Sequence, residues 1–251
     1  MALYKTKAVV LRSQDLGEAD RLIVFYSEKA GKIKAVAKGL RRTSSKFGAR
    51  LEVFTFLDLI LYEKGEAPLE IITQAQIITS FKEIRQDLRR IAYGSYLVEL
   101  TESLLSEKEP DNRLLSLILQ SLHWLRLEVN PLLPPFFTLR ILSLLGYEPH
   151  LSCCLICHQE PGKGMRFSVH RGGIICPDCR IDEETGQISS SALSLMRRLL
   201  GLDLRQIRGL SIPNSLIDEL TSWLFKNYLP YYLSRPLKSV KFLEGESKCV
   251  V

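Results

Sequence analysis

Two Cys-x-x-Cys pairs stand in the second half of this chain of 251 residues, separated from each other by 18 positions. The pairs are Cys154 with Cys157 and Cys176 with Cys179. Each pair presents two thiolates on one side of a tight turn, and two such turns complete a tetrahedron around a zinc ion, with Zn–S bonds of about 2.3 Å. The spacing therefore predicts that these four cysteines hold one zinc ion. A pair of redox dithiols, or a site that has lost its metal, is the alternative interpretation.

The other cysteines and the nearby histidines are not needed as ligands. Cys153 precedes Cys154 and competes with it, but the Cys-x-x-Cys spacing favours Cys154. Four thiolates fill the tetrahedron, so His158 and His170 are interpreted as bystanders and the zinc as structural rather than catalytic. Cys249 near the C-terminus is interpreted as a free thiol. Because the N-terminal residues do not resemble a secretion signal, a cytosolic metal site is favoured over a disulfide framework.

A run of positive charge without any acid extends from Gly31 to Arg50. Its first part, up to Lys38, alternates lysine with small or apolar residues, which predicts a strand with one solvent-exposed face. From Gly39 to Gly48 the alternation is lost, which predicts a flexible loop. Cations on a strand face and on the following loop suit a phosphate backbone, and an ordinary solvated face is the alternative. The predicted nucleic-acid contacts are Lys32, Lys34, Lys38, Arg41, Arg42, Lys46 and Arg50.

Charge is distributed unevenly along the chain, whose net charge is +6. Residues 1–50 contain twelve Lys or Arg and four Asp or Glu, whereas the remaining residues contain 22 basic and 24 acidic ones. This asymmetry predicts a polyanionic partner for the N-terminal part and a different role for the rest. An apolar run of about 18 residues would indicate a membrane span, and the sequence contains none, so no membrane association is expected.

The pattern of residues 3–79 predicts an all-β region. Five strands in fewer than 80 residues suit a small closed barrel, and the five-stranded OB-fold is the best-known solution. Four aromatic residues are candidates for base stacking, although a place in the core is the more frequent outcome for each. They are Phe47, Phe54, Phe56 and Tyr62. The predicted strands cover residues 4–11, 21–26, 32–38, 51–62 and 69–78.

Helical periodicity begins after the last predicted strand and indicates five helices. Ser80 and Glu83 have capping-box spacing, which predicts that the first helix begins there. Asp111 is the predicted N-cap of the second helix, and Ser189 or Ser190 caps the first helix after the cysteines. The predicted helices cover residues 81–106, 114–129 and 136–145 before the cysteines, and a stretch up to residue 200 and residues 213–228 after them.

Together these elements predict an α+β chain, in which an N-terminal five-stranded OB-fold barrel precedes an all-α domain with an inserted four-cysteine zinc module. The predicted boundaries are 1–79 for the barrel, 80–149 and 181–243 for the helical domain, 150–180 for the zinc module and 244–251 for a loose tail. The sequence contains no GxxxxGK[ST], GxGxxG or GxSxG motif and no readable catalytic cluster. We therefore expect a protein that is not an enzyme and binds no nucleotide.

The order of these parts and the motifs of the N-terminal region resemble the RecO family of bacterial recombination mediators. The cysteine module after three helices matches this family, and the similarity extends from Tyr4 to about Leu243. Some family members lack the cysteines, whereas this chain keeps all four, so zinc is expected. The most specific motifs are Gly17-Glu18-Ala19-Asp20-Arg21, Gly31-Lys32 and Ala37-Lys38-Gly39-Leu40-Arg41-Arg42.

The resemblance implies a cytoplasmic, nucleoid-associated bacterial protein with an oligonucleotide-binding barrel and a helical domain. Proteins of this family bind single- and double-stranded DNA and anneal complementary strands. With the ring-forming RecR they load the RecA recombinase onto strands coated by single-stranded-DNA-binding protein. They also contact the acidic, apolar C-terminal tail of that coating protein through the helical domain, and no nucleotide hydrolysis is implied.

Two further expectations concern the helical domain and the class of nucleic acid. An acidic tail requires cations beside apolar grooves, and the candidates are Arg126, Arg140, Arg197 and Arg198. A barrel with a zinc module would serve RNA equally well, so a zinc-ribbon RNA-binding protein is the alternative function. A nuclease is a second alternative, but it requires a carboxylate cluster that the sequence does not offer.

Overall fold

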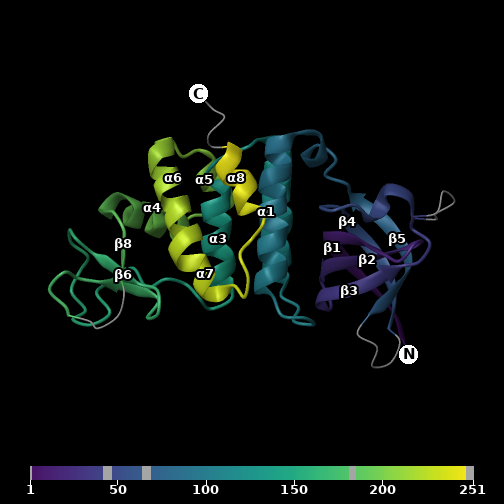
Figure 1. Ribbon diagram of the computed structural model, residues 1–251, viewed down its shortest axis with the longest axis horizontal. Helices are drawn as coiled ribbons and strands as arrows, with labels where there is room; N and C mark the ends of the chain where they lie inside the picture. Colours follow the sequence, from purple (N-terminus) through teal and green to yellow (C-terminus); the bar gives the residue numbers. More distant parts are fainter. Residues whose placement is uncertain (1, 42–46, 64–68, 181–184, 247–251) are drawn as a thin grey trace. The chain divides into compact units, whose positions relative to one another are not determined.

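The computed structural model describes residues 2–41, 47–63, 69–180 and 185–246 (Figure 1). The chain divides into two compact units. The first comprises residues 1–129 and 241–251, and the second comprises residues 130–240, so the first two helices group with the strands and the third with the cysteines. None of the helices in the described ranges has both the length and the apolar character that a membrane span requires.

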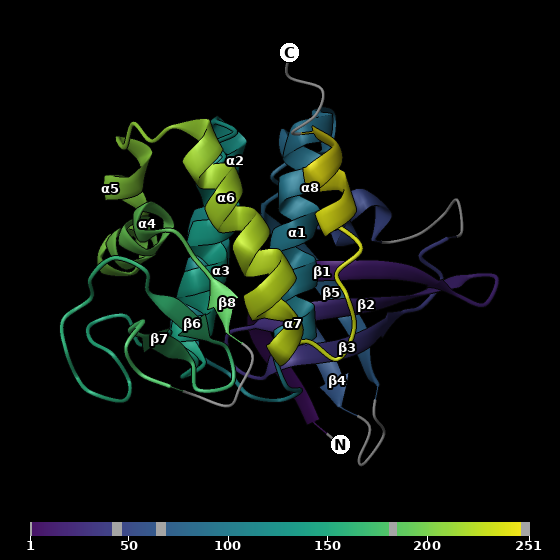
Figure 2. The same cartoon turned by 60° about the vertical axis from the view of Figure 1, so that its left-hand side comes forward.

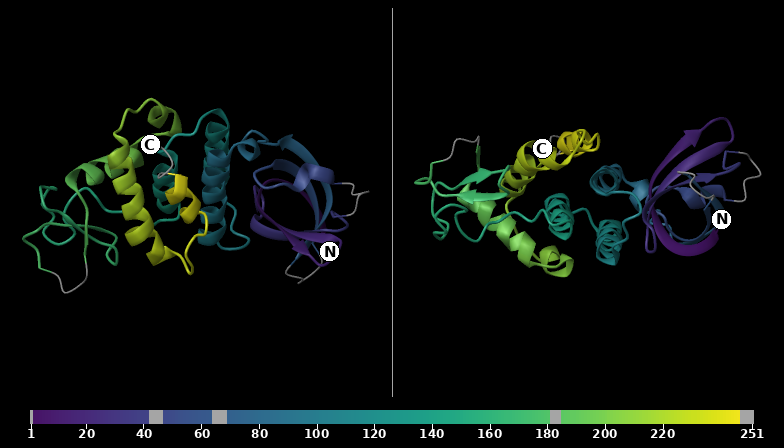
Figure 3. Two further views of the ribbon diagram at one scale, coloured as in Figure 1. Left: turned by 45° about the horizontal axis from the view of Figure 1, so that its top comes forward. Right: turned by 90° about the horizontal axis from the view of Figure 1, so that it is seen from below.

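Five strands form a closed barrel in the first unit. Their order around the wall is β1-β2-β3-β5-β4, with β4 next to β1. All neighbours are antiparallel except β3 and β5, which pair in parallel. The predicted five-stranded OB-fold barrel is thereby confirmed (Figure 3). The strands are β1 (Ala2–Leu16), β2 (Asp20–Ser27), β3 (Gly31–Ala37), β4 (Phe56–Glu63) and β5 (Glu70–Thr79).

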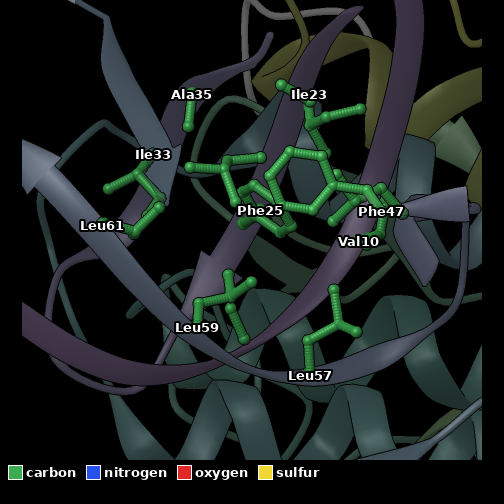
Figure 4. Packing of buried hydrophobic residues seen from close by; sticks show 13 residues of the cluster. Val10, Ile23, Phe25, Ile33, Ala35, Phe47, Leu57, Leu59 and Leu61 are labelled. Carbon is green, nitrogen blue, oxygen red and sulfur yellow. The ribbon is translucent and has the colours of Figure 1, made fainter. Parts of the chain in front are cut away.

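Alternate side chains of each strand fill the interior of the barrel, as the strand period of two requires. Phe25 from β2 and Ile33 from β3 meet Leu59 from β4 and the ring of Phe47 in this core (Figure 4). Each of these side chains is at most 2% exposed. Phe47 and Phe54, two of the candidates for base stacking, are therefore buried parts of the fold.

The fourth strand begins at Phe56, five residues later than predicted. A 3-10 turn, η1 (Gly48–Leu51), and a turn at residues 53–54 precede it. Phe54 has a φ of 76°, a left-handed conformation that a strand does not allow. Its ring packs against Gly94 in the following helix, where an added Cβ would lie 3.1 Å from the ring. Burial of this aromatic ring therefore outweighs the strand-like pattern of the sequence.

The first long helix begins at Leu88, and the predicted capping box of Ser80 and Glu83 is wrong. Its N-cap is Asp87, whose carboxylate accepts a hydrogen bond from the backbone N–H three residues later at 3.0 Å. Phe81 has a left-handed backbone, with a φ of 46°, and this conformation interrupts a helix while it buries the ring. The helical elements here are η2 (Ile84–Gln86), α1 (Leu88–Leu104) and α2 (Asn112–Leu127).

The start of α2 is attached to the barrel by Tyr26 of β2. The Tyr26 hydroxyl accepts a hydrogen bond from the backbone N–H of Asp111 at 2.9 Å. Burial raises the pKa of Tyr26, so this hydroxyl is protonated at neutral pH. The carboxylate of Asp111 accepts a bond from the backbone N–H of Arg113 at 2.8 Å, which confirms Asp111 as the N-cap.

The segment between α1 and α2 covers an edge of β3. Because β3 pairs with β5 through only two residue pairs, the first half of β3 needs another partner. The backbone N–H of Lys108 donates to the carbonyl oxygen of Lys32 at 3.1 Å. Beside it, Gly31 lies so close to the backbone of Glu109 that a Cβ would be 2.3 Å from the Glu109 carbonyl oxygen.

The second unit combines helices with a small sheet (Figure 2). β6 is the central strand, with β7 and β8 antiparallel on its two sides. Trp223 of α6 packs edge-on against Phe167 of β6, with ring centroids 4.9 Å apart, and joins the helices to the sheet. The elements are α3 (Leu133–Leu144), β6 (Arg166–Ser168), β7 (Gly173–Ile175), β8 (Gly186–Gln187), α4 (Ser190–Gly201), α5 (Leu204–Arg208), α6 (Asn214–Trp223), η3 (Leu224–Tyr228) and α7 (Leu229–Tyr232).

Two proline-containing segments are helical where the sequence pattern predicts a stop. α3 begins at Leu133, and Pro134 and Pro135 occupy its first turn, where a missing N–H costs no hydrogen bond. α6 continues through the π-helical turn η3 into α7, which contains Pro230 in its first turn. The Ser189 cap of α4 forms as predicted.

The sequence pattern also misses two short helices, α5 and α8 (Val240–Glu246). The chain was expected to be loose over residues 244–251, yet α8 continues to Glu246. Burial of Leu243, which is 8% exposed, gives this helix an anchor. Residues 247–251 lie outside the described residues.

Replacing Gly31 by alanine should destabilise the protein more than the same change at Gly17. Both glycines have a positive φ, of 62° and 64°, so both variants carry the strain of a left-handed alanine, about 1–2 kcal/mol. Only at Gly31 would the new Cβ meet another segment, since nothing lies within 4 Å of it at Gly17. We expect urea unfolding to show a loss larger by about 1 kcal/mol or more for Gly31→Ala. Equal losses would contradict the close approach of Glu109.

Candidate metal centre and nucleic-acid interface

Four cysteine sulfurs meet in the second unit. The Sγ atoms of Cys154, Cys157, Cys176 and Cys179 all lie within 4.8 Å of one another. The sulfurs of Cys154 and Cys179 are 3.9 Å apart, and those of Cys157 and Cys176 are 3.6 Å apart. A tetrahedron with metal–sulfur bonds of about 2.3 Å has edges of roughly 3.8 Å, so these sulfurs stand at the right separation for one ion. The cluster contains Cys154 and not Cys153.

The backbone around Cys154 favours the form of the thiol that binds a metal. The backbone N–H groups of Ile156 and Cys176 donate to its sulfur at 3.4 Å and 3.3 Å. Burial by itself raises the pKa of this thiol, but the backbone donors outweigh burial and lower the pKa to about 6. These donors favour the thiolate, and a bound cation would favour it further.

The hairpin of β6 and β7 sets the distance between the two cysteine pairs. Nη2 of Arg166 donates to the carbonyl oxygens of Cys176 and Cys179, at 3.2 Å and 2.5 Å, and so fixes the second turn. Gly173 of β7 lies against the segment before the first turn, since an added Cβ would be 2.7 Å from the carbonyl oxygen of His150. Two turns far apart in the sequence are thus held side by side.

The neighbouring histidines have other contacts. The backbone N–H of His158 donates to the carbonyl oxygen of Cys154 at 3.0 Å, and its φ of 60° closes the first turn. His170 packs against Tyr231, with ring centroids 6.2 Å apart. Within the described residues, the sulfur cluster includes no histidine.

The two lysines of β3 have partners within the first unit. Nζ of Lys32 donates to the carbonyl oxygen of Glu102 in α1 at 2.9 Å, and Nζ of Lys34 forms an ion pair with Glu107. Burial lowers the pKa of Lys32, and the bond from Lys34 lowers the pKa of Glu107. The face of β3 that the alternation places in solvent is therefore half-buried under α1 and the following segment. A phosphate group would have to displace these partners.

The first residues of the basic loop are attached to the hairpin of β1 and β2. The backbone N–H of Arg41 donates to the carbonyl oxygen of Ala19 at 3.0 Å, and its Nη1 donates to that of Gly17 at 2.9 Å. The backbone N–H of Gly39 donates to the carboxylate of Asp20 at 2.8 Å. Arg41 therefore has a defined position at the exit of β3.

Asp15 joins Arg41 to a second arginine, Arg21, which is not among the predicted nucleic-acid contacts. Oδ1 of Asp15 accepts a bond from Nε of Arg21 at 3.0 Å, and Oδ2 lies 3.6 Å from Nη1 of Arg41. Arg21 stands outside the acid-free run. Because β2 and β3 pair with Arg21 opposite Ala37, the register brings it to the start of the loop.

The other predicted nucleic-acid contacts differ in position. Lys38 and Arg50 are exposed, as is Arg41, whereas Arg42 and Lys46 lie outside the described residues. Arg50 also lines a hollow of about 350 Å³ together with residues of β5. Exposed cations of the predicted set are therefore found at the exit of β3 and on η1, next to the loop.

The four arginines predicted to bind a partner are divided between the two units. Arg126 lies on α2 in the first unit, and the other three lie in the second. Arg140 and Arg197 each donate to a backbone carbonyl oxygen, at 3.0 Å and 2.8 Å, and so support their own unit. Arg198 is exposed in the last turn of α4.

Comparison with known proteins covers nearly all of this chain. The family model described as "Recombination protein O N terminal" matches residues 1–81, and that described as "Recombination protein O C terminal" matches residues 85–241. The chain belongs to the RecO family. The resemblance drawn from the sequence motifs is thereby confirmed, and the two RecO regions meet close to η2, just before α1.

Relatives named "DNA repair protein RecO" align over most of both chains. That of Alkaliphilus metalliredigens is 35% identical over 237 residues, which are 93% of this chain and 95% of the relative. That of Symbiobacterium thermophilum is 35% identical over 251 residues, which cover 97% of this chain and 98% of the relative. The RecO protein of Rubrobacter xylanophilus is 37% identical over 211 residues, which cover 82% of this chain and 84% of the relative.

Replacing Cys176 by serine should abolish metal binding by the cluster, whereas replacing Cys153 should not. Cys176 belongs to the sulfur cluster, and Cys153 instead lies 3.2 Å from Nε2 of His150. Since a structural metal contributes folding free energy, we expect Cys176→Ser to lose about 2 kcal/mol or more of stability. Elemental analysis and thermal unfolding of both variants test this. Equal metal content in the two would contradict the assignment of the ligands.

Proposed function

We propose that this chain is a DNA repair and recombination mediator. It binds single- and double-stranded DNA, anneals complementary strands and, with RecR, helps load RecA onto strands coated by single-stranded-DNA-binding protein. Support comes from membership of the RecO family and from relatives named DNA repair protein RecO that match nearly the whole chain. The proposal places the protein in the bacterial cytoplasm, at the nucleoid, and assigns it no enzymatic activity.

The observation that carries this proposal is a closed OB-fold barrel with a cationic loop between β3 and β4. Barrels of this class bind oligonucleotides with one strand face and adjacent loops. Lys38, Arg41 and Arg50 are exposed around the loop, whereas Lys32 and Lys34 bond to groups of α1 and the segment after it. We therefore place the strand along the loop rather than on the outer face of β3.

Charge neutralisation accounts for annealing without an energy source. Two complementary strands repel each other through their phosphates, and cations that bind both backbones lower this repulsion until pairing begins. Base pairing and stacking then supply the free energy, so nucleotide hydrolysis is not required. The anchored position of Arg41 on the β1–β2 hairpin gives the loop a fixed starting point for this role.

We propose that the four cysteines bind one zinc ion. Four thiolates at tetrahedral separation suit zinc, and such a set leaves no coordination position for water or substrate. When bound, zinc would supply a structural link between the two turns, which Arg166 and the β6–β7 hairpin already bring together. The elemental analysis of the cysteine variants identifies the metal.

The salt dependence of single-strand binding should show how many predicted cations reach phosphates. If all seven engage, the logarithm of the affinity falls with the logarithm of salt concentration at a slope of about −5, and without Lys32 and Lys34 the slope is about −3.5. We expect fluorescence anisotropy titrations to give the shallower slope, about −3.5. A matched Lys34→Gln variant should keep the same slope, and a slope reduced by about 0.7 would show that Lys34 contacts DNA after all.

Annealing of two labelled complementary DNA strands, without ATP, should depend on the loop. We expect at least about a tenfold loss of rate at low salt when Arg41, Arg42 and Lys46 become glutamate, because attraction to phosphate turns into repulsion. The control reverses the same number of charges at exposed lysines elsewhere in the first unit, Lys7, Lys29 and Lys82. Equal losses would refute the loop as the site, and tighter binding of RNA than of DNA would favour the RNA-binding alternative.

We also propose that an acidic tail of single-stranded-DNA-binding protein binds the helical part of the chain. Because Arg140 and Arg197 hold backbone carbonyl groups, Arg126 and Arg198 remain the stronger candidates of the predicted set. Arg235, which lines an apolar hollow of about 210 Å³, joins them. The three charges are reversed one at a time. At least one of these variants should bind a synthetic acidic peptide more weakly than the wild type, without a change in its unfolding midpoint. If no reversal weakens it, the idea is refuted.

A further inference from the structure

Beside the exit of β3, two arginines border a hollow of about 220 Å³. Arg21 comes from the first residues of β2 and Arg41 from the turn after β3. Both side chains are 40% exposed, so each is partly packed along the surface while a ligand can still reach it. The hollow is lined by Arg21, Leu40, Arg41, Gly48, Leu51 and Glu52.

Both guanidinium groups are held in place by the β1–β2 hairpin. Arg21 donates through Nε to Asp15 at 3.0 Å and through Nη1 to Oγ of Ser13 at 3.4 Å. Arg41 uses Nη1 for its bond to Gly17 and for its ion pair with Asp15. A guanidinium has five N–H donors, so these contacts orient the two groups and leave further donors for a ligand. Such preorganisation lowers the entropic cost of binding an anion.

The charge of the hollow is positive despite two acids nearby. The single carboxylate of Asp15 is shared by two guanidinium groups, which leaves one positive charge uncompensated. Glu52, the acid that lines the hollow, forms an ion pair with Arg85 at 2.9 Å, so its charge is balanced from the other side. An anion that enters here meets paired donors and a net attraction.

The size and the floor of the hollow indicate which anion fits. Leu51 is 2% exposed and Leu40 packs on the barrel core, so the floor is apolar. A volume of about 220 Å³ is below the roughly 300–1,000 Å³ of pockets that enclose a whole small molecule. The hollow therefore suits one group of a longer chain, namely a phosphodiester with part of its sugar or base above the two leucines.

We propose that Arg21 and Arg41 bind one backbone phosphodiester of a polynucleotide at this hollow, and that Asp15 is the positioning residue for both. This rests on the proposed DNA binding and adds Arg21, a residue outside the basic run, to the interface. The two arginines act as a pair, because a guanidinium fork reaches two phosphate oxygens where a lysine offers a point charge.

The test compares Arg21→Gln with Lys5→Gln in the full-length protein. Lys5 is a matched control, since it is exposed and ion-paired, with Asp58 at 2.7 Å, yet it stands at the other end of β1. For binding of an oligothymidylate we expect Arg21→Gln to lose about tenfold in affinity and to leave the salt slope nearly unchanged, because Arg41 still neutralises the shared phosphate. Arg21→Lys should recover only part of the affinity, because a lysine offers a point charge in place of a fork of donors, and Lys5→Gln should match the wild type.

A double-mutant cycle, together with stability measurements, distinguishes a loss of phosphate contact from a loss of affinity caused by destabilisation. Arg41→Gln alone should weaken binding, and the Arg21→Gln, Arg41→Gln double variant should lose less than the two single losses combined, because both groups hold the same phosphate. Thermal unfolding is measured for each variant. Fully additive losses of affinity would overturn the assignment of a shared phosphate to the two arginines. A loss of affinity that follows the unfolding midpoint alone would overturn it as well.

The remaining outcomes separate this inference from the proposed function. If the wild type binds DNA and Arg21→Gln behaves like Lys5→Gln, the inference is overturned and DNA binding stands. If the wild type binds no DNA at any salt concentration, the proposed function falls and this inference with it. A thymidine monophosphate that competes as strongly as the oligothymidylate would mean that the hollow accepts a free nucleotide, which also overturns the polynucleotide assignment.

Discussion

Closure of the barrel depends on a short parallel contact between β3 and β5, which consists of only two residue pairs. An uncovered edge would leave backbone donors and acceptors of β3 without partners, so another segment is required there. The segment after α1 supplies it through the bond from Lys108 to Lys32. The same closure buries Glu70, whose carboxylate accepts a hydrogen bond from the hydroxyl of Tyr4 at 2.7 Å. Burial raises the pKa of both groups. The barrel and the first two helices are therefore one compact unit, although their sequence patterns differ.

This arrangement divides the positive charges of the N-terminal region into two groups. Lys32 and Lys34 satisfy groups of the covering helix and segment, and they contribute to the attachment of α1 to the barrel. Arg41 and Arg21 are instead oriented by Asp15 toward the surface around the loop. A count of charges treats all of these residues alike. Their physical roles differ, because Lys32 is half-buried and bonded to a backbone carbonyl group of α1, whereas Arg21 and Arg41 border a hollow at the surface.

The four-cysteine cluster is organised in a different way from the barrel. Each cysteine pair lies within one short turn, so its geometry follows from local sequence, and the backbone donors to Cys154 come from the turns themselves. Only the distance between the two turns depends on the wider fold, through the β6–β7 hairpin and Arg166.

The sequence by itself determined the features that depend on neighbours within a few positions. These are the barrel strands, from a period of two, the N-cap at Asp111, the cluster of four cysteines with Cys154 in preference to Cys153, and the family, from contiguous motifs. The tertiary structure decided where distant segments meet. It alone placed Arg21 beside Arg41, covered the lysine face of β3, and gave Phe54 and Phe81 left-handed backbones. The reason is physical, since burial, strand register and edge pairing are set by segments that lie far apart in the chain.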